Sequence, residues 1–218
     1  MTELSPAILT NDISDFRKQY AQLFALSHYF TKLHVDFIDD TFIQNKTVLP
    51  SELGFLKSSP FTLMAHFMTL DPQKYFEAAK TAGFKWVIFQ LEAFKRDEEI
   101  DKTIEKAKSL GLKPGLSLSA ETPLHMAGKF IRKVDLIQLM GIHPGFQGRP
   151  FMVSTIGKIT ELRSLSKSVI IAVDGGVKIG IARQCAKAGA DILVAGSAIL
   201  KSEDEEMAIE SLKADIET

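Results

Sequence analysis

Eight short apolar runs recur along this chain of 218 residues, and amphipathic stretches separate them. Each run has the length of a buried strand, and several of the stretches between them end at a glycine, as helices do. Eight strands alternating with helices in a chain of this length are typical of an α/β protein with a (β/α)8 TIM barrel. A doubly wound open sheet is the structural alternative. The expected strands span residues 5–9, 33–38, 61–68, 85–90, 113–119, 135–142, 169–174 and 191–196.

The stretches between the strands carry helix boundary signals. In one of them, Asp71 suits the N-cap, Pro72 the first helical position and Gly83 the exit. Residues 97–111 are acidic at their start and basic toward their end, as the helix dipole favours. No Pro/Gly/Ser-rich linker interrupts the pattern, so one barrel domain is expected over residues 1–218.

The composition argues against several functional classes. The formal net charge is −1 and the basic residues form no block, which argues against a nucleic-acid partner. The single cysteine, Cys185, excludes an internal disulfide. The N-terminus has no basic region followed by a long apolar core, and the longest aliphatic run is too short to cross a bilayer. We therefore expect a cytoplasmic protein without a membrane partner.

Polar side chains gather near the carboxyl ends of the expected strands. In the second strand one face is apolar, and the other carries His34 and Asp36. His66 lies near the end of the third strand and Asp174 at the end of the seventh. Each residue alone is more commonly a cap or a satisfied polar group, but a barrel brings all four to one end. Two imidazoles and two carboxylates there suit one divalent ion: Zn²⁺, Fe²⁺, Mn²⁺ or Co²⁺.

Glycine-rich segments follow three consecutive strands at the same end, at residues 143–148, 174–176 and 195–197. Glycines expose backbone N–H groups, and a short helix after the eighth strand would direct its positive end toward an anion. The loops after strands seven and eight of such barrels often hold a phosphate. Turn formation would also explain glycines, but three such loops in succession favour a phosphate site.

These motifs, taken in order, resemble the signatures of the ribulose-phosphate 3-epimerase family. The segments that carry the resemblance are HVDFID with TFIQN, HFM, MGIHPGFQGRPF, VDGGV and ADILVAGSAI. The match runs from SPAIL near the start to about Leu200. It implies a barrel that inverts C3 between D-ribulose 5-phosphate and D-xylulose 5-phosphate, with one divalent metal ion, in a homo-oligomer (dimer or hexamer).

The resemblance also implies roles for individual residues. His34, Asp36, His66 and Asp174 would bind the metal, and the two aspartates would act as opposing acid and base. Removal of the C3 proton gives an enediolate that a cation can stabilise, and inversion without turning the substrate needs one carboxylate on each face. The residues expected to contact the substrate or its phosphate are Ala7, His66, Met68, Met140, Gly145, Phe146, Gln147, Gly148, Gly175, Gly176, Gly196 and Ser197.

Several positions depart from the usual family pattern. Ala7 replaces a serine, Ile38 a methionine and Gln90 a histidine. Ser119 replaces an asparagine, and Gln147 replaces a glycine of the phosphate loop. The metal and catalytic set is intact while the residues that shape the substrate pocket are changed, so the chemistry is better determined than the sugar.

Alternatives stay open. An epimerase of a longer ketose phosphate, such as allulose 6-phosphate, would use the same mechanism in a wider pocket. An idle phosphosugar-binding paralogue would have lost a ligand or a catalytic aspartate, and neither loss is seen. Barrels of the orotidine-phosphate decarboxylase and hexulose-phosphate synthase type carry a lysine where this chain has Asp36. Among the other histidines, His143 is a candidate ligand contact, whereas His28 and His125 are expected to be structural or at the surface.

Overall fold

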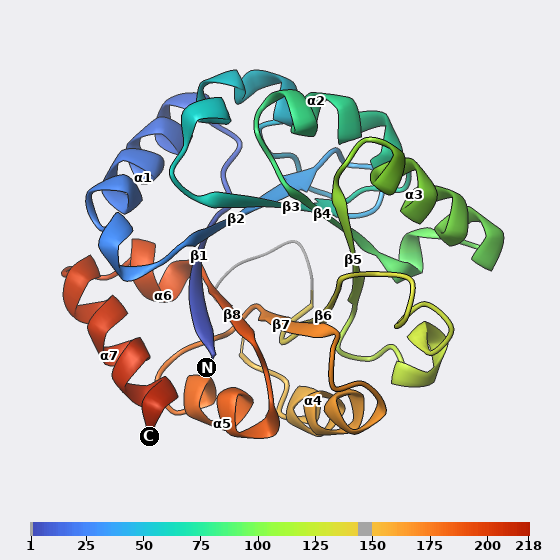
Figure 1. The fold of residues 1–218 in the computed structure, drawn as a ribbon. Coiled ribbons are helices and arrows are strands. Elements are labelled where there is room, and N and C mark those ends of the chain that lie inside the picture. The colour runs from blue at the N-terminus through green and yellow to red at the C-terminus, as the bar shows by residue number, and fades with distance from the viewer. Residues whose placement is uncertain (1, 144–149) are drawn as a thin grey trace.

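A computed structural model describes residues 2–143 and 150–218. Eight parallel strands close into a barrel in sequence order, with β1 paired to both β2 and β8. Figure 1 shows the strands as an inner ring and the helices as an outer ring. The (β/α)8 TIM barrel is confirmed, and the open-sheet alternative is wrong. The strands are β1 (Glu3–Ile8), β2 (Lys32–Ile38), β3 (Thr62–Met68), β4 (Trp86–Gln90), β5 (Lys113–Leu118), β6 (Leu136–Met140), β7 (Ile170–Asp174) and β8 (Ile192–Ala195).

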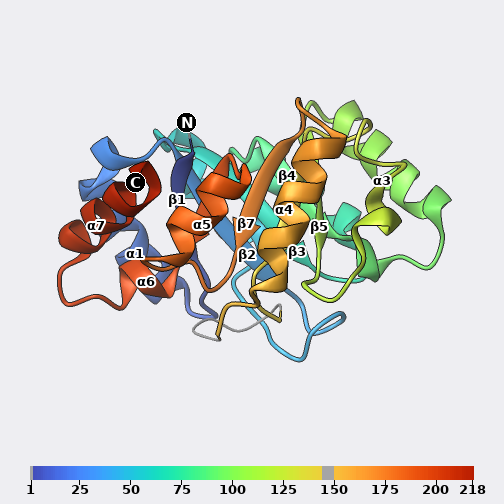
Figure 2. The same cartoon turned by 90° about the horizontal axis from the view of Figure 1, so that it is seen from below.

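The α-helices pack outside the strands, and Figure 2 shows α4, α5 and α7 side by side along one flank. No helix in the described ranges is long and apolar enough to cross a bilayer. The α-helices are α1 (Ile13–Ala25), α2 (Phe76–Thr81), α3 (Asp97–Ser109), α4 (Ser154–Leu165), α5 (Ile181–Ala188), α6 (Ser197–Leu200) and α7 (Glu205–Glu217). The 3₁₀ helices are η1 (Ser27–Tyr29), η2 (Pro50–Glu52), η3 (Gly54–Ser58), η4 (Pro72–Tyr75), η5 (Leu91–Ala93) and η6 (Leu124–Ala127).

The predicted helix boundaries are right in one case and partly wrong in another. The acidic start and basic end of residues 97–111 correspond to α3. Before α2, however, the first turn is the 3₁₀ helix η4, and the side chain of Asp71 makes no capping hydrogen bond. Pro72 begins that turn as expected, and Gly83 after α2 has φ +99°, which suits a glycine exit.

Each strand has one face toward the helices and the other toward the barrel interior. In β2, Leu33, Val35 and Phe37 belong to the core between sheet and helices. His34 and Asp36 alternate with them, so they face the interior, and both are buried. A buried carboxylate needs partners, and the residues at the same end of the barrel supply them. A second, smaller interior cluster of apolar residues is formed by Ala7, Met64, Trp86, Ile88, Leu136, Ala172, Ile192 and Val194.

Candidate metal centre and active site

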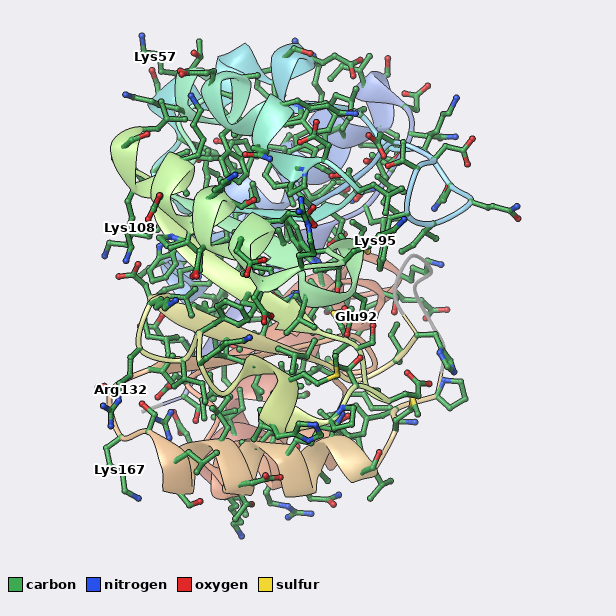
Figure 3. The ribbon with its side chains drawn as sticks, turned by 90° about the vertical axis from the view of Figure 1, so that its right-hand side faces the viewer. Lys57, Glu92, Lys95, Lys108, Arg132 and Lys167 are labelled. Carbon is green, nitrogen blue, oxygen red and sulfur yellow. The ribbon has the colours of Figure 1, made fainter. Side chains whose placement is uncertain are left out.

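The carboxyl ends of the strands form one rim of the barrel. In the side view of Figure 3, Glu92 and Lys95, which follow β4, lie at this rim, and Arg132 and Lys167 lie at the opposite end. The rim is where a (β/α)8 barrel places its functional residues.

Four polar side chains from three strands meet inside this rim. The pairing of β2 with β3 sets Asp36 opposite His66, whereas Asp174 ends β7, which β1 and β8 separate from β2. His66 Nδ1 lies 2.9 Å from Asp36 Oδ1 and 3.3 Å from Asp174 Oδ2. His34 Nε2 lies 3.3 Å from Asp36 Oδ1 and 3.7 Å from Asp174 Oδ2. The fold therefore brings together the four residues that the sequence predicted as one cluster.

The four side chains fit one divalent cation. One potential ligand atom from each of them lies within 4.8 Å of all the others, and all four residues are buried. Within the described residues neither ring nitrogen of His34 makes a hydrogen bond, although Nε2 lies 3.3 Å from Asp36 Oδ1. Because a buried polar group without a hydrogen bond is costly, an ion bound at Nε2 would compensate for the missing bond. Two imidazoles with two carboxylates match the ligand preferences of zinc and related transition metals.

The imidazole rings and the carboxylates of the cluster shift one another's pKa values. Burial opposes ionisation of Asp36, but the His34 and His66 rings outweigh burial and hold the pKa of that carboxyl below its usual range. Burial also opposes protonation of His66, but Asp174 and Asp36 outweigh it and raise the pKa of that ring to about 9. A cation must displace this proton, so metal binding should weaken as the pH falls.

A band of buried polar side chains lies beside the four. Gln90, Ser117 and Gln138 are register neighbours across β4, β5 and β6, and all are fully buried. The amide nitrogen of Gln138 lies 3.1 Å from Asp174 Oδ2 and 3.2 Å from His66 Nδ1. The amide nitrogen of Gln90 lies 3.0 Å from His66 Nε2. These amides can orient the ring and the carboxylate that they touch.

The sequence did not identify this band. From the sequence, Gln90 is only a departure from the family pattern, and Gln138 carries no expectation. The signal that could have found Gln138 is the period of two in β6, where it alternates with Ile137 and Leu139 of the outer core and must face inward.

A pocket at the rim is lined by both Asp36 and Asp174. His66 is buried and is not one of the lining residues that the structure describes. Predicted substrate contacts that line the pocket are Ala7, Met68, Met140, Gly175, Gly176, Gly196 and Ser197. Further lining residues, which the sequence did not suggest, are Leu9, Ile142, Val177 and Val194. The predicted contacts Gly145, Phe146, Gln147 and Gly148 lie outside the described residues.

Glycines let the ends of β6 and β7 approach closely beside Asp174. The Gly141 N–H donates to the Asp174 carbonyl at 2.7 Å, and a Cβ on Gly141 would lie 2.3 Å from the Gly175 carbonyl oxygen. Gly175 and Gly176 have φ of +95° and +71°, in the region that favours glycine. After β8, the short helix α6 begins directly beyond Gly196, so the short helix expected there is confirmed.

The loop after β5 is held to its neighbours at the rim. Glu92 Oε1 accepts a hydrogen bond from the Ser119 N–H at 2.8 Å and another from the Thr122 hydroxyl. The Lys158 ammonium, from α4, donates to the carbonyls of Ala120 and Thr122 at 2.5 and 2.6 Å. Position 119, one of the departures from the family pattern, is therefore fixed through its backbone.

The remaining histidines lie at the surface. His125 is exposed, as expected. His28, expected to be structural, is exposed too, with its ring centroid 4.2 Å from that of Tyr29. His143 is also exposed, and its Nδ1 lies 3.0 Å from Glu121 Oε1. It does not line the pocket formed by the described residues.

Sequence comparisons match the chain over nearly its full length. The model of the Ribulose-phosphate 3 epimerase family matches residues 3–200. A ribulose-phosphate 3-epimerase of Escherichia coli (strain K12) is 31% identical over 219 residues, covering 98% of this chain and 95% of that protein. One of Schizosaccharomyces pombe is 29% identical over 216 residues, covering 97% of this chain and 92% of that protein.

Solved structures with lower identity share the fold. A 3-hexulose-6-phosphate synthase superposes with a TM-score of 0.73 at 20% identity, covering 98% of this chain and 99% of that chain. The orotidine 5'-phosphate decarboxylase from Pyrococcus horikoshii OT3 superposes with a TM-score of 0.70 at 16% identity, with 99% of each chain covered. At these identities the similarity is evidence for the barrel and for nothing finer.

Proposed function

This chain belongs to the ribulose-phosphate 3-epimerase family, and we propose that it is a metal-dependent epimerase that inverts C3 of a ketose phosphate. The first candidate substrate is D-ribulose 5-phosphate, with D-xylulose 5-phosphate as the product. The observation that carries the proposal is the pair of carboxylates, Asp36 and Asp174, which line one pocket from strands that are not neighbours.

His34, Asp36, His66 and Asp174 would hold the metal ion, because together they offer two imidazole nitrogens and two carboxylate oxygens in a buried cluster. When bound, a divalent cation supplies positive charge that stabilises the anion formed when C3 loses its proton. The family resemblance supports this role, and so do the His34 nitrogens, neither of which makes a hydrogen bond within the described residues.

Asp36 is proposed as the base for one epimer. It takes the proton from C3, the electron pair of the broken C–H bond forms a C2=C3 bond, and the electrons of the C2 carbonyl bond move onto its oxygen to give the enediolate. Asp174, which starts this direction protonated, then donates its proton to the opposite face of C3, and the roles exchange in the reverse direction. The Gln138 amide, 3.1 Å from Asp174 Oδ2, would keep that carboxyl oriented toward the pocket.

The phosphate is proposed to bind at the glycine-rich edge of the same pocket. Gly175, Gly176, Gly196 and Ser197 line the pocket on the β7 and β8 side. Their backbone N–H groups can surround a dianion at a distance from the reacting carbon.

A coupled assay on D-ribulose 5-phosphate, run with metal analysis of the same preparation, tests the proposal. We expect turnover that follows metal content. Faster turnover of allulose 6-phosphate would move the assignment to the longer ketose phosphate. Saturable binding of both sugars without turnover by the metal-loaded protein would indicate the idle paralogue and overturn the proposal.

A further inference from the structure

Gln90, the last residue of β4, has its side-chain amide against the outer nitrogen of His66. The residue is fully buried, and its Nε2 lies 3.0 Å from His66 Nε2. Its other amide atom, Oε1, has no hydrogen-bond partner in the described part of the chain. A polar oxygen buried without a partner calls for an explanation.

The tautomer of His66 depends on which partner donates in its contact with Gln90, the Gln90 amide or the His66 Nε2–H. If the Gln90 amide donates, His66 Nε2 accepts, and a neutral ring then carries its proton on Nδ1. That atom lies 2.9 Å from Asp36 Oδ1 and 3.3 Å from Asp174 Oδ2. Nδ1 is thus the ring nitrogen that faces both carboxylates, and it is the atom that would bind a cation.

A ring that binds metal through Nδ1 must carry its proton on Nε2 instead, because only a nitrogen with a free electron pair is a ligand. An Nε2–H needs an acceptor, and among the described residues Gln90 is the side chain in contact with this atom. A half-turn of the amide exchanges its oxygen and nitrogen, which differ little in size, and brings Oε1 to Nε2. The unpaired oxygen then has a partner.

We propose that Gln90 is a positioning residue whose Oε1 accepts the Nε2–H of His66 in the metal-loaded site. In this role Gln90 keeps Nδ1 of the ring free for the cation and fixes the plane of the ring. Outer partners of this kind commonly change metal affinity by about 10- to 100-fold. The inference rests on the proposed metal site and extends it to a residue that departs from the usual family pattern.

Two substitutions of similar size separate hydrogen bonding from packing. Gln90→Met fills the space but offers no comparable acceptor, whereas Gln90→Glu keeps an acceptor and loses the donor. The metal-free proteins would be titrated with Co²⁺ in competition with a chelator, with the visible absorption of the bound ion as the signal. We expect Gln90→Met to bind about 10- to 100-fold more weakly than wild type and Gln90→Glu to bind at least as tightly as wild type. Binding by Gln90→Met within about twofold of wild type, or equal weakening in both variants, would overturn the inference.

The tautomer of His66 can be measured by NMR in the wild-type protein, without any substitution. In wild-type protein loaded with Zn²⁺ and labelled with ¹⁵N-histidine, long-range ¹H–¹⁵N spectra distinguish a ring protonated on Nε2 from one protonated on Nδ1. We expect the Nε2–H form for His66 in the loaded protein, and a proton on Nδ1 there would overturn the inference even if Gln90→Met did not fold.

These measurements use no sugar, so the two proposals can fail separately. A protein that binds Co²⁺ with the expected dependence on Gln90 but turns over no ketose phosphate would overturn the proposed function and leave this inference standing. A wild-type protein that binds no Co²⁺ would overturn both.

Discussion

His34 and Asp36 alternate with Leu33, Val35 and Phe37 along β2, and this alternation places two polar groups in a closed interior. Polar side chains exposed to solvent would need no protein partner, but buried ones do. The partners here, His66 and Asp174, come from strands that are distant in the sequence.

Metal retention tests the cluster at this scale. His66→Ala removes one ligand and should lower metal content and turnover together, because three remaining ligands hold the ion less tightly. Metal analysis and the coupled assay measure both quantities, and the melting temperature reports the fold. His125→Ala, which changes an exposed histidine on η6, is the matched control. A His66→Ala protein with full metal and full rate would exclude His66 from the site.

Residues that combine into a motif could be given a role from the sequence, whereas for a residue outside a motif the strand period gives at most the direction of its side chain and not its partner. The four cluster residues lie near the carboxyl ends of their strands, where (β/α)8 barrels place their functional residues. Gln138 is a single amide within the apolar run of β6, and its contact with Asp174 depends on the packing of two strands. The atom of His66 that faces the carboxylates likewise follows from geometry alone.

At the scale of elements, the eight strands begin and end within about two residues of their predicted positions, in keeping with the usual uncertainty of boundaries. Their apolar runs are nearly continuous because each strand is buried on both faces, and such runs are easy to recognise in the sequence. The helical segments are less regular. Where the sequence predicts an α-helix from Pro72, the first turn is the 3₁₀ helix η4, and Asp71 makes no capping hydrogen bond to it. The local sequence does not distinguish a 3₁₀ turn from an α-helical one.

The close approach of β6 and β7 can be tested with glycines. A Cβ on Gly141 would lie 2.3 Å from the Gly175 carbonyl oxygen and 2.5 Å from Phe151 Cε2. Gly141→Ala should therefore displace the end of β7, lower the free energy of unfolding by about 1–3 kcal/mol, and reduce turnover through Asp174. Urea unfolding measures the first effect and the coupled assay the second.

Gly157, within α4, has open space where a side chain would begin, since a Cβ there would meet no atom within 4 Å. Gly157→Ala is therefore the matched control. It should be neutral or stabilising by up to about 1 kcal/mol, because alanine favours a helix over glycine. Equal effects of the two substitutions would contradict the close contact at Gly141.

The turn after β2 predicts a pH dependence. Asp39 accepts hydrogen bonds from the Thr41 backbone and hydroxyl and the Tyr75 hydroxyl, and it pairs with Lys74 at 2.9 Å. Burial opposes its ionisation, but these partners outweigh burial and lower the pKa of Asp39 to about 2. The next residue, Asp40, has φ +71°, so the network also holds a turn that would favour glycine.

A folded-state pKa below the unfolded value stabilises the protein above the unfolded pKa, and that stability is lost as the pH falls toward the folded one. Wild type should therefore be more stable than Asp39→Asn at neutral pH. The difference in unfolding free energy should narrow by about 1 kcal/mol between about pH 6 and about pH 3. Urea unfolding of both proteins across this range measures it. A difference that does not change with pH would mean that Asp39 is not the titrating group.

At the scale of the whole molecule, closure of the barrel is what converts residues dispersed over most of the chain into one site. Asp36 and Asp174 are brought to one pocket because β1 pairs with β8. The homo-oligomer implied by the family resemblance stays a prediction.

The proposed phosphate site makes the substrate's non-reacting end important for turnover. Binding energy from a phosphate can position C3, so free D-ribulose should lose roughly two to four orders of magnitude in kcat/KM relative to its 5-phosphate. Gly196→Asp should lower the rate on the phosphorylated substrate, because it places a like charge beside the dianion. Comparable rates for D-ribulose and its 5-phosphate would move the search to unphosphorylated ketoses.

The central claim is that one carboxylate serves each face of C3, and proton exchange tests it most directly. Metal-loaded wild-type protein in D₂O should produce D-xylulose 5-phosphate from D-ribulose 5-phosphate with deuterium at C3 in the NMR spectrum. Asp174→Asn should abolish epimerisation while Asp36 still exchanges the C3 proton of one epimer with solvent. No deuterium at C3 in the wild-type product, or equal exchange from both epimers in Asp174→Asn, would contradict the assignment of one base to each face.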